Sequence, residues 1–121
     1  MKCMFMHAAS FNQPIGEWDV SKVTNMTSMF EMAGNFNQPI GYWDTSNVTK
    51  MVYMFLGDAS FNQDISGWDV SKVITMEGMF FGAENFNQPI RDWDTSNVSN
   101  MGSMFCWAES FNLENAPWYH E

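Results

Sequence analysis

Residues 11–30 read FNQPIGEWDVSKVTNMTSMF, and residues 36–55 read FNQPIGYWDTSNVTKMVYMF. The second stretch repeats the first after 25 residues with few substitutions, and the same pattern continues along the chain. The phenylalanines that open successive units are Phe11, Phe36, Phe61, Phe86 and Phe111. A fixed period of roughly 20 to 50 residues indicates a solenoid, a propeller or another array of repeated units. The repeat therefore predicts the architecture more strongly than any single motif does.

The period divides the chain into units that we expect to form one domain over residues 1–121. The complete units are residues 11–35, 36–60, 61–85 and 86–110. A partial unit, residues 1–10, precedes them, and a degenerate unit, residues 111–121, follows them. We expect about four to five stacked coils, because one unit cannot bury its apolar face alone and its neighbours must cover it. The last unit is expected to act as a C-terminal cap, whereas the first shows no polar cap.

Each unit predicts one short strand followed by a short helix. Over residues 15–20, Trp18 and Val20 share one side of an extended chain and Asp19 takes the other. Ser21 stands where a helix N-cap belongs. Apolar residues then follow at the spacing of one helix face: Val23, Met26, Met29 and Phe30. Stacked units would place their strands in parallel, so the expected fold is an α/β repeat solenoid with one strand and one helical segment per coil.

The asparagine that follows each opening phenylalanine predicts bonds between coils. An unpaired buried amide costs about 1–3 kcal/mol, so we expect this buried row to bond the backbone of the neighbouring coil. The methionine and phenylalanine rows are expected to be core, because methionine fills irregular apolar space.

The complete unit, F-N-Q-P-I-x-x-W-D-[VT]-S-x-V-x-x-M-x-x-M-F, resembles the BspA-like repeat of bacterial surface proteins over nearly the whole chain. It is also similar to the surface lipoprotein repeats of mycoplasmas. Its I-x-x-W-x-V spacing resembles the strand of leucine-rich repeats, although Val23 stands where those repeats carry Asn or Cys. The resemblance implies a right-handed, leucine-rich-repeat-like solenoid. It also implies a surface-exposed role in adhesion or recognition, and hence a cell-surface or extracellular location.

Composition narrows the class of partner. The chain has a formal net charge of −9, which repels nucleic acid and anionic membrane surfaces. No apolar run is long enough to span a membrane, and residues 1–7 do not read as a signal peptide. We therefore expect a protein or glycan partner, and the residues by themselves leave the location of the protein unassigned.

No arrangement of residues indicates an enzyme, and no cofactor is expected. His7 and His120 lie alone at opposite ends, and no cysteine and histidine spacing suggests zinc. Cys3 and Cys106 are about four coils apart, roughly 19 Å at the spacing of neighbouring strands, so we predict no disulfide within the chain.

An aspartate row is the strongest candidate for chemistry: Asp19, Asp44, Asp69 and Asp94. One interpretation is a cation site, most plausibly for Ca²⁺, which prefers oxygen ligands. The favoured interpretation is structural: each carboxylate bonds the serine two residues later or the N–H groups that open the predicted helix. The sequence thus predicts no metal site and keeps calcium as the weaker alternative.

Comparison among the units separates constant from variable positions. The variable residues Glu17, Tyr42, Asp92 and Arg91 are expected to lie on the outer strand face, where the scaffold does not require their identity. Together with the aspartate row they are the predicted contact surface. The expected function is a non-enzymatic scaffold that binds a protein or glycan. The alternative is a structural subunit or fragment that stacks through an open coil end into a larger assembly, which allows self-association.

Overall fold

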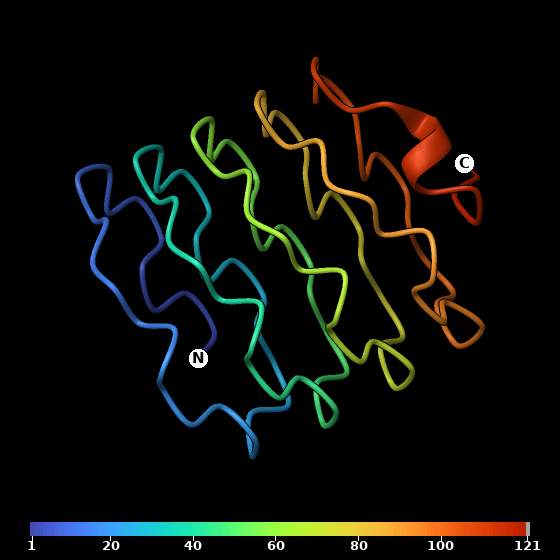
Figure 1. The fold of residues 1–121 in the computed structure, drawn as a ribbon, viewed down its shortest axis with the longest axis horizontal. Helices are drawn as coiled ribbons and strands as arrows, with labels where there is room; N and C mark the ends of the chain where they lie inside the picture. The colour runs from blue at the N-terminus through green and yellow to red at the C-terminus, as the bar shows by residue number, and fades with distance from the viewer. Residues whose placement is uncertain (121) are drawn as a thin grey trace.

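A computed structural model describes residues 1–120 of the 121-residue chain. The backbone winds through successive coils that lie side by side along the long axis of the molecule (Figure 1). Residues 25 positions apart are neighbours in adjacent coils, and Asn25, Lys50, Thr75 and Asn100 form a chain of parallel backbone bridges. The repeat of the sequence is therefore also the repeat of the structure.

The predicted strands and helices are wrong. Within residues 1–120 the one regular element is a 3₁₀ helix, η1, over Leu113–Asn115, and the parallel bridges stay isolated, so they build no sheet. Residues 15–20 form no strand, and residues 23–30 form no helix. The chain is thus not an α/β solenoid of the leucine-rich-repeat kind with a strand in every coil.

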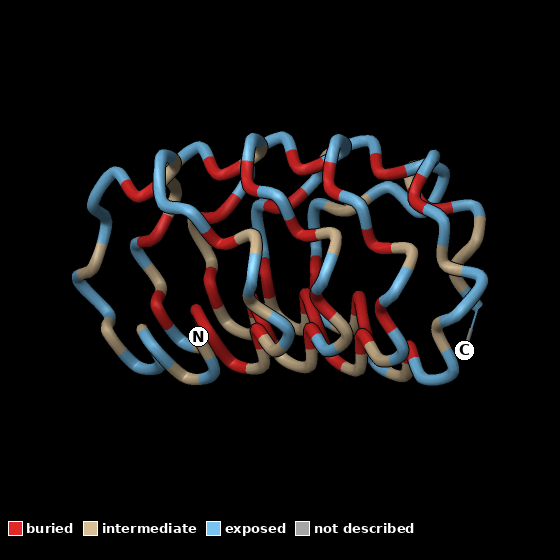
Figure 2. The backbone as a smooth tube through the Cα atoms, turned by 90° about the horizontal axis from the view of Figure 1, so that it is seen from below, coloured by how far each residue is buried: buried red, intermediate tan, exposed pale blue. Residues whose placement is uncertain are grey.

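Each coil is instead a succession of tight turns. In the first complete unit, the N–H groups of Trp18, Val23 and Met29 donate to the carbonyl groups three residues earlier, at 3.1, 2.9 and 3.2 Å. Short buried and exposed stretches alternate along the coils as a result (Figure 2). Because such a bond joins residues i and i+3, buried apolar residues recur at a spacing of three, which is also a spacing on one helix face. The helix prediction failed because this spacing does not separate a helix from a run of turns.

Side chains join the coils on the side of residues 11–20. Asn12 Oδ1 accepts a hydrogen bond from the Asn37 N–H at 2.9 Å, and Trp43 Nε1 donates to the Ile15 carbonyl at 3.1 Å. Both bonds recur in the following coils with a shift of 25 residues. The expected bonding of the asparagine row between coils is confirmed, although this row lies at the surface and not in the core. Side-chain bonds thus replace the backbone ladder that a strand prediction requires.

Backbone groups join the coils on the opposite side. Met26, Ser28 and Phe30 each donate the N–H to the carbonyl group 24 residues later, at 2.8 to 2.9 Å. Two positions per coil on this side have positive φ, and glycine occupies three of them, Gly57, Gly78 and Gly82. The other seven such positions hold larger residues in a conformation that glycine adopts most readily.

Stacked aromatic rings form the core between these two sides. The Phe30, Phe55 and Phe80 rings follow one another at 5.6 Å with interplanar angles of 4 to 11°. A parallel row contains Phe11, Phe36 and Phe61, and the ring of Phe36 lies 4.0 Å from that of Phe30. The methionines at positions equivalent to Met26 in the inner coils are also buried. The prediction that the phenylalanine and methionine rows are core is confirmed.

The two ends of the stack differ. At the C-terminal end, Trp118 remains in register: its ring stacks on Trp93 at 5.9 Å, and the Tyr119 ring meets Phe105 edge-on at 5.0 Å. At the N-terminal end, the apolar side chains of Met4 and Trp18 are 49% and 40% exposed. Aromatic contacts thus continue into the last coil, although Trp107 and Leu113 toward that end are 75% and 57% exposed.

Candidate functional site

The predicted contact residues lie at the tips of equivalent turns. The turn closed by the Trp18 N–H on Ile15 has Gly16 and Glu17 at its tip, and the next coils place Tyr42 and Asp92 at the position of Glu17. All of these acidic and aromatic tip residues are exposed, and Tyr42 is 99% exposed. They line one edge of the stack rather than the outer face of a sheet.

Arg91 occupies the neighbouring tip position in the fourth complete unit. Its guanidinium donates a hydrogen bond to the backbone carbonyl of Glu114, which lies within η1. Arg91 therefore ties the turn edge to the C-terminal segment, and its charge stays exposed at the end of the row.

The scaffold does restrict two of the variable tip positions. A Cβ at Gly16 would lie 2.4 Å from the Pro39 carbonyl oxygen, and one at Gly41 would lie 2.5 Å from that of Asp64. Such distances require the next coil to shift, because the obstacle is backbone. In these two coils glycine lets the tip approach the neighbouring coil closely, so the expectation of free variation does not hold there.

The aspartate row makes the structural bonds that the sequence favoured. Each Asp Oδ1 accepts from the N–H and the hydroxyl group of the serine two residues later; for Asp19 and Ser21 these distances are 3.0 and 2.6 Å. The pairs at Asp44, Asp69 and Asp94 repeat this geometry. The serine hydroxyl bond is the main cause that lowers the pKa of each carboxyl below its usual value. These carboxylates are thus charged and locally satisfied; they cap turns, not helices.

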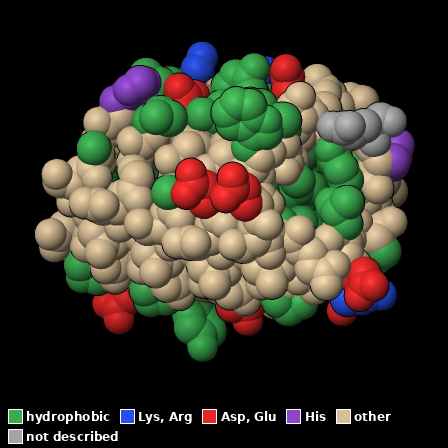
Figure 3. Space-filling model, turned by 90° about the horizontal axis from the view of Figure 1, so that it is seen from above, with side chains coloured by type: hydrophobic (Ala, Val, Ile, Leu, Met, Phe, Trp, Pro, Cys, Tyr) green, Lys and Arg blue, Asp and Glu red, His purple; other side chains and the backbone are tan. Residues whose placement is uncertain are grey.

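The acidic groups do not gather into a metal centre. Over the described residues, no group of three or more His, Cys, Asp or Glu side chains is arranged to hold a metal ion. In the view of Figure 3, acidic side chains are separated by uncharged surface and by hydrophobic side chains. The calcium alternative for the aspartate row stays a prediction without a supporting cluster.

A groove opens beside the turn tips of the first two coils. Its volume is about 1010 Å³, and its lining consists of Pro14, Gly16, Glu17, Trp18, Pro39 and Tyr42. It includes two of the predicted contact residues, Glu17 and Tyr42. Trp18 was not expected at the surface, because it is one of a repeated tryptophan row; the equivalent Trp43, Trp68 and Trp93 are buried, whereas Trp18 is 40% exposed.

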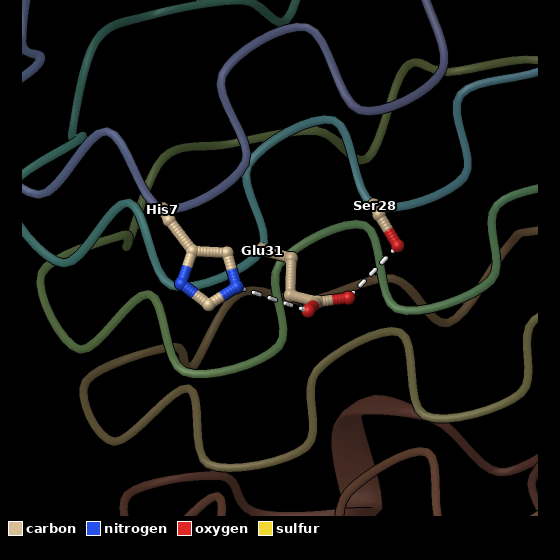
Figure 4. A network of polar contacts seen from close by, with 3 residues as sticks. All are labelled: His7, Ser28 and Glu31. Carbon is tan, nitrogen blue, oxygen red and sulfur yellow. Dashed lines mark hydrogen bonds and ion pairs between the residues drawn. The ribbon is translucent and has the colours of Figure 1, made fainter.

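A polar cluster that sequence reasoning missed lies on the opposite side of the coils (Figure 4). Ser28 Oγ donates to Glu31 Oε1 at 2.8 Å, and His7 Nε2 lies 3.8 Å from Glu31 Oε2. The carboxylate stands between the hydroxyl and the imidazole, so His7 is not placed to take the Ser28 proton as a general base would. A spacing of 24 residues between His7 and Glu31 is the signal that could have revealed the pair, since backbone groups on this side pair at that spacing.

A buried carboxyl was also missed. Asp58 is fully buried, and neither of its side-chain oxygens has a hydrogen-bond partner. Burial raises its pKa from 3.8 to about 8, although the nearby backbone N–H groups of Ser60 and Phe61 oppose this shift. The equivalent positions of the other units all carry alanine: Ala8, Ala33, Ala83 and Ala108. That contrast within the repeat was the available signal.

The two cysteines and the question of a membrane span remain. Cys3 and Cys106 are free, half-buried thiols. The part of the chain that the structure describes contains no helix long and apolar enough to cross a membrane.

Comparison with protein families gives a match over nearly the whole chain. A family model described as "Mycoplasma protein of unknown function, DUF285" matches residues 1–118. No curated protein and no solved structure matches the chain. The match is consistent with the similarity of the repeat unit to mycoplasma repeats. It assigns no activity, partner or location to the chain. Because the model covers nearly all of the sequence, the chain belongs to this DUF285 family of Mycoplasma proteins.

Proposed function

We propose that the protein is a non-enzymatic repeat scaffold that binds a protein or glycan partner along its edge of turn tips. The observation that carries this proposal is the contrast between constant turns and variable, exposed tips. A buried isoleucine opens each of these turns, while the tip position changes from Glu17 to Tyr42, Gly67 and Asp92. Extended repeat proteins bind through surfaces of this kind.

The chemistry of the edge supports recognition rather than reaction. Exposed aromatic and acidic side chains supply apolar contact and charge, and a fully exposed tyrosine such as Tyr42 is an effective contact residue at interfaces. The resemblance to BspA-like repeats supports a role in surface adhesion or recognition.

The test is a binding screen of the chain against arrays of immobilised oligosaccharides and synthetic peptides. A Tyr42→Ala variant should lose roughly fivefold or more in affinity for any specific binder, because truncation of a contact tyrosine at the centre of an interface costs about 1 kcal/mol or more, which corresponds to that factor. An Ile74→Ala variant is the matched control, since Ile74 is an exposed apolar residue outside the turn edge. Binding that both variants retain equally would refute the turn edge as the contact surface.

A structural role is the second candidate, and apolar side chains exposed in the first coil favour it. Met4 and Trp18 are 49% and 40% exposed there. Stacking of the first coil on another coil would bury this apolar surface. Light scattering over a range of concentrations tests this role: association that a Met4→Lys variant abolishes supports it, and a monomer at every concentration excludes it.

A further inference from the structure

A second opening, which we call the tip hollow, lies between the turn tips of the second and third complete units. Tyr42 lines it from one unit, and Gln63, Asp64, Ser66 and Gly67 line it from the next. Each of these two units has a further described unit on its other side, so the lining does not depend on either end of the chain. The volume of about 340 Å³ is near the lower limit for pockets that hold a small ligand, so the tip hollow suits one side chain rather than a long segment.

The third unit departs from the repeat at the residues that line this hollow. Asp64 replaces the proline that the other three complete units carry, and Gly67 replaces the larger tip residue of those units. A Cβ at Gly67 would meet only the Gly41 carbonyl oxygen, at 4.0 Å, so the backbone does not require glycine there. The missing side chain instead leaves space beside Tyr42, at the place where the repeat gains a carboxylate.

An aromatic ring and a charged carboxylate thus face the same space. Tyr42 is 99% exposed, so the faces of its ring are open to a partner. The Asp64 carboxyl is also exposed, and its Oδ1 accepts from the Ser66 N–H at 2.9 Å. Hydrogen bonds from Ser66 lower the pKa of this carboxyl and keep it charged. A carboxylate accepts at about four lone-pair sites, so Asp64 retains capacity for a bound group.

The lining offers hydrogen-bond acceptors and negative charge. Gln63 Nε2 donates to the carbonyl and the Oδ1 of Asn37 at 3.2 and 3.0 Å, so the group that Gln63 can offer to a partner is its amide oxygen. No lysine or arginine of the described chain contributes to the pKa shift of Asp64. Arg91, the cation at the turn tips, donates instead to the Glu114 carbonyl. The complementary group is therefore a cation with several N–H donors.

We propose that the tip hollow binds an arginine side chain of a protein partner. The guanidinium group lies against the ring of Tyr42 and pairs with the carboxylate of Asp64. A guanidinium carries five N–H donors and no acceptor, stacks on aromatic faces and pairs with a carboxylate through two bonds, whereas the ammonium group of lysine lacks this planar fork. The net charge of −9 attracts a cationic partner and gives no advantage to a neutral glycan. This inference rests on the proposed function, because it names the class of partner for the same turn edge.

The experiment is a nuclear magnetic resonance titration of the isotope-labelled chain with a synthetic glycine–serine peptide that carries one arginine. The backbone N–H resonances of Tyr42, Ser66 and Gly67 should shift saturably, and the affinity should fall as salt is added. Two control peptides replace the arginine by citrulline, which has the same shape without the charge, or by lysine. The citrulline peptide should bind at least roughly tenfold more weakly, and the lysine peptide about threefold more weakly.

Four variants locate the site. Asp64→Pro restores the residue of the other units, and the backbone N–H of Asp64 donates to no described group, so the coil should keep its fold. This variant should bind the arginine peptide at least roughly tenfold more weakly. Tyr42→Ala should weaken binding about fivefold, whereas Tyr42→Phe keeps the ring and should bind like the wild type. Glu84→Gln is the matched control, because it removes one exposed carboxylate outside the turn edge and should leave binding unchanged.

Two sets of results would overturn the inference in different ways. The arginine site is wrong if the arginine peptide shows no saturable shift at these resonances up to about 10 mM, if the citrulline peptide binds as tightly, or if Asp64→Pro binds as well as Glu84→Gln. The scaffold function stands in that case if another ligand of the binding screen still requires Tyr42. If no ligand of either class depends on Tyr42, the inference and the proposed function both fail.

Discussion

Replacement of Asp58 by alanine should stabilise the protein, and the gain should grow as the pH rises. The Asp58 carboxyl is buried without a hydrogen-bond partner, and the four equivalent positions of the repeat accommodate alanine. The folded chain holds a proton on this carboxyl up to about pH 8, whereas the unfolded chain releases it above its ordinary pKa of 3.8. Folding therefore takes up a proton between these values, and the stability of the wild-type protein falls as the pH rises through that window.

The size of the effect follows from the same two pKa values. Each pH unit inside the window changes the free energy of unfolding by about 1.36 kcal/mol. A pKa shift from 3.8 to about 8 thus corresponds to a total of roughly 6 kcal/mol, a large part of the stability of a small domain. This figure is an upper limit, because local opening lets the carboxyl ionise without global unfolding. Between pH 5 and 7 the advantage of Asp58→Ala should grow by up to about 3 kcal/mol.

Urea unfolding followed by tryptophan fluorescence measures this difference at several pH values from 5 to 8. All other titrating groups are shared by the two proteins, so subtraction isolates the contribution of Asp58. Asp58→Asn is the matched control: it removes the charge and the pH dependence, but it leaves buried polar atoms unpaired and should be less stable than Asp58→Ala. A difference between wild type and Asp58→Ala that stays constant from pH 5 to 8 would refute the reasoning.

Three further predictions concern the coils. Trp68→Phe should cost about 1–3 kcal/mol, because the Ile40 carbonyl loses its buried indole donor, whereas Trp18→Phe should have little effect on urea unfolding. Gly82→Ala should lower the melting temperature by the equivalent of about 1 kcal/mol, since its φ is +69°, and Ser103→Gly, at φ 57°, should raise it; shifts of the same sign would contradict this. Gly16→Ala should cost about 1–3 kcal/mol through the contact with the Pro39 carbonyl. Calorimetry should find no such loss for Gly34→Ala, because a Cβ there meets nothing within 4 Å.

The repeat and the inward rows could be predicted from the sequence. A period without insertions places each residue next to its copies 25 positions away, whatever the local backbone conformation is. That is why the Phe30 row, the coil-to-coil bond of Asn12 and the pairing of Asp19 with Ser21 were all predictable. Each depends on the period or on a short local contact.

The local conformation could not be predicted in the same way. Turns closed between residues i and i+3 and one face of a helix share an apolar spacing of three, so the sequence pattern does not separate them. The strand prediction failed for a related reason: burial does alternate around Trp43, but the side chains of Asn12 and Trp43, not backbone groups, join the coils there.

The candidate site was predictable only in part. Variation within the repeat identified Glu17 and Tyr42, because a position that changes while its neighbours stay constant is free of the core. The groove and the unpartnered carboxyl of Asp58 depend on which atoms of other coils lie within reach. The sequence by itself thus determined the period, the rows and the variable edge. Only the tertiary structure decided the turns and the site, since burial and hydrogen bonding are set by contacts between residues far apart in the chain.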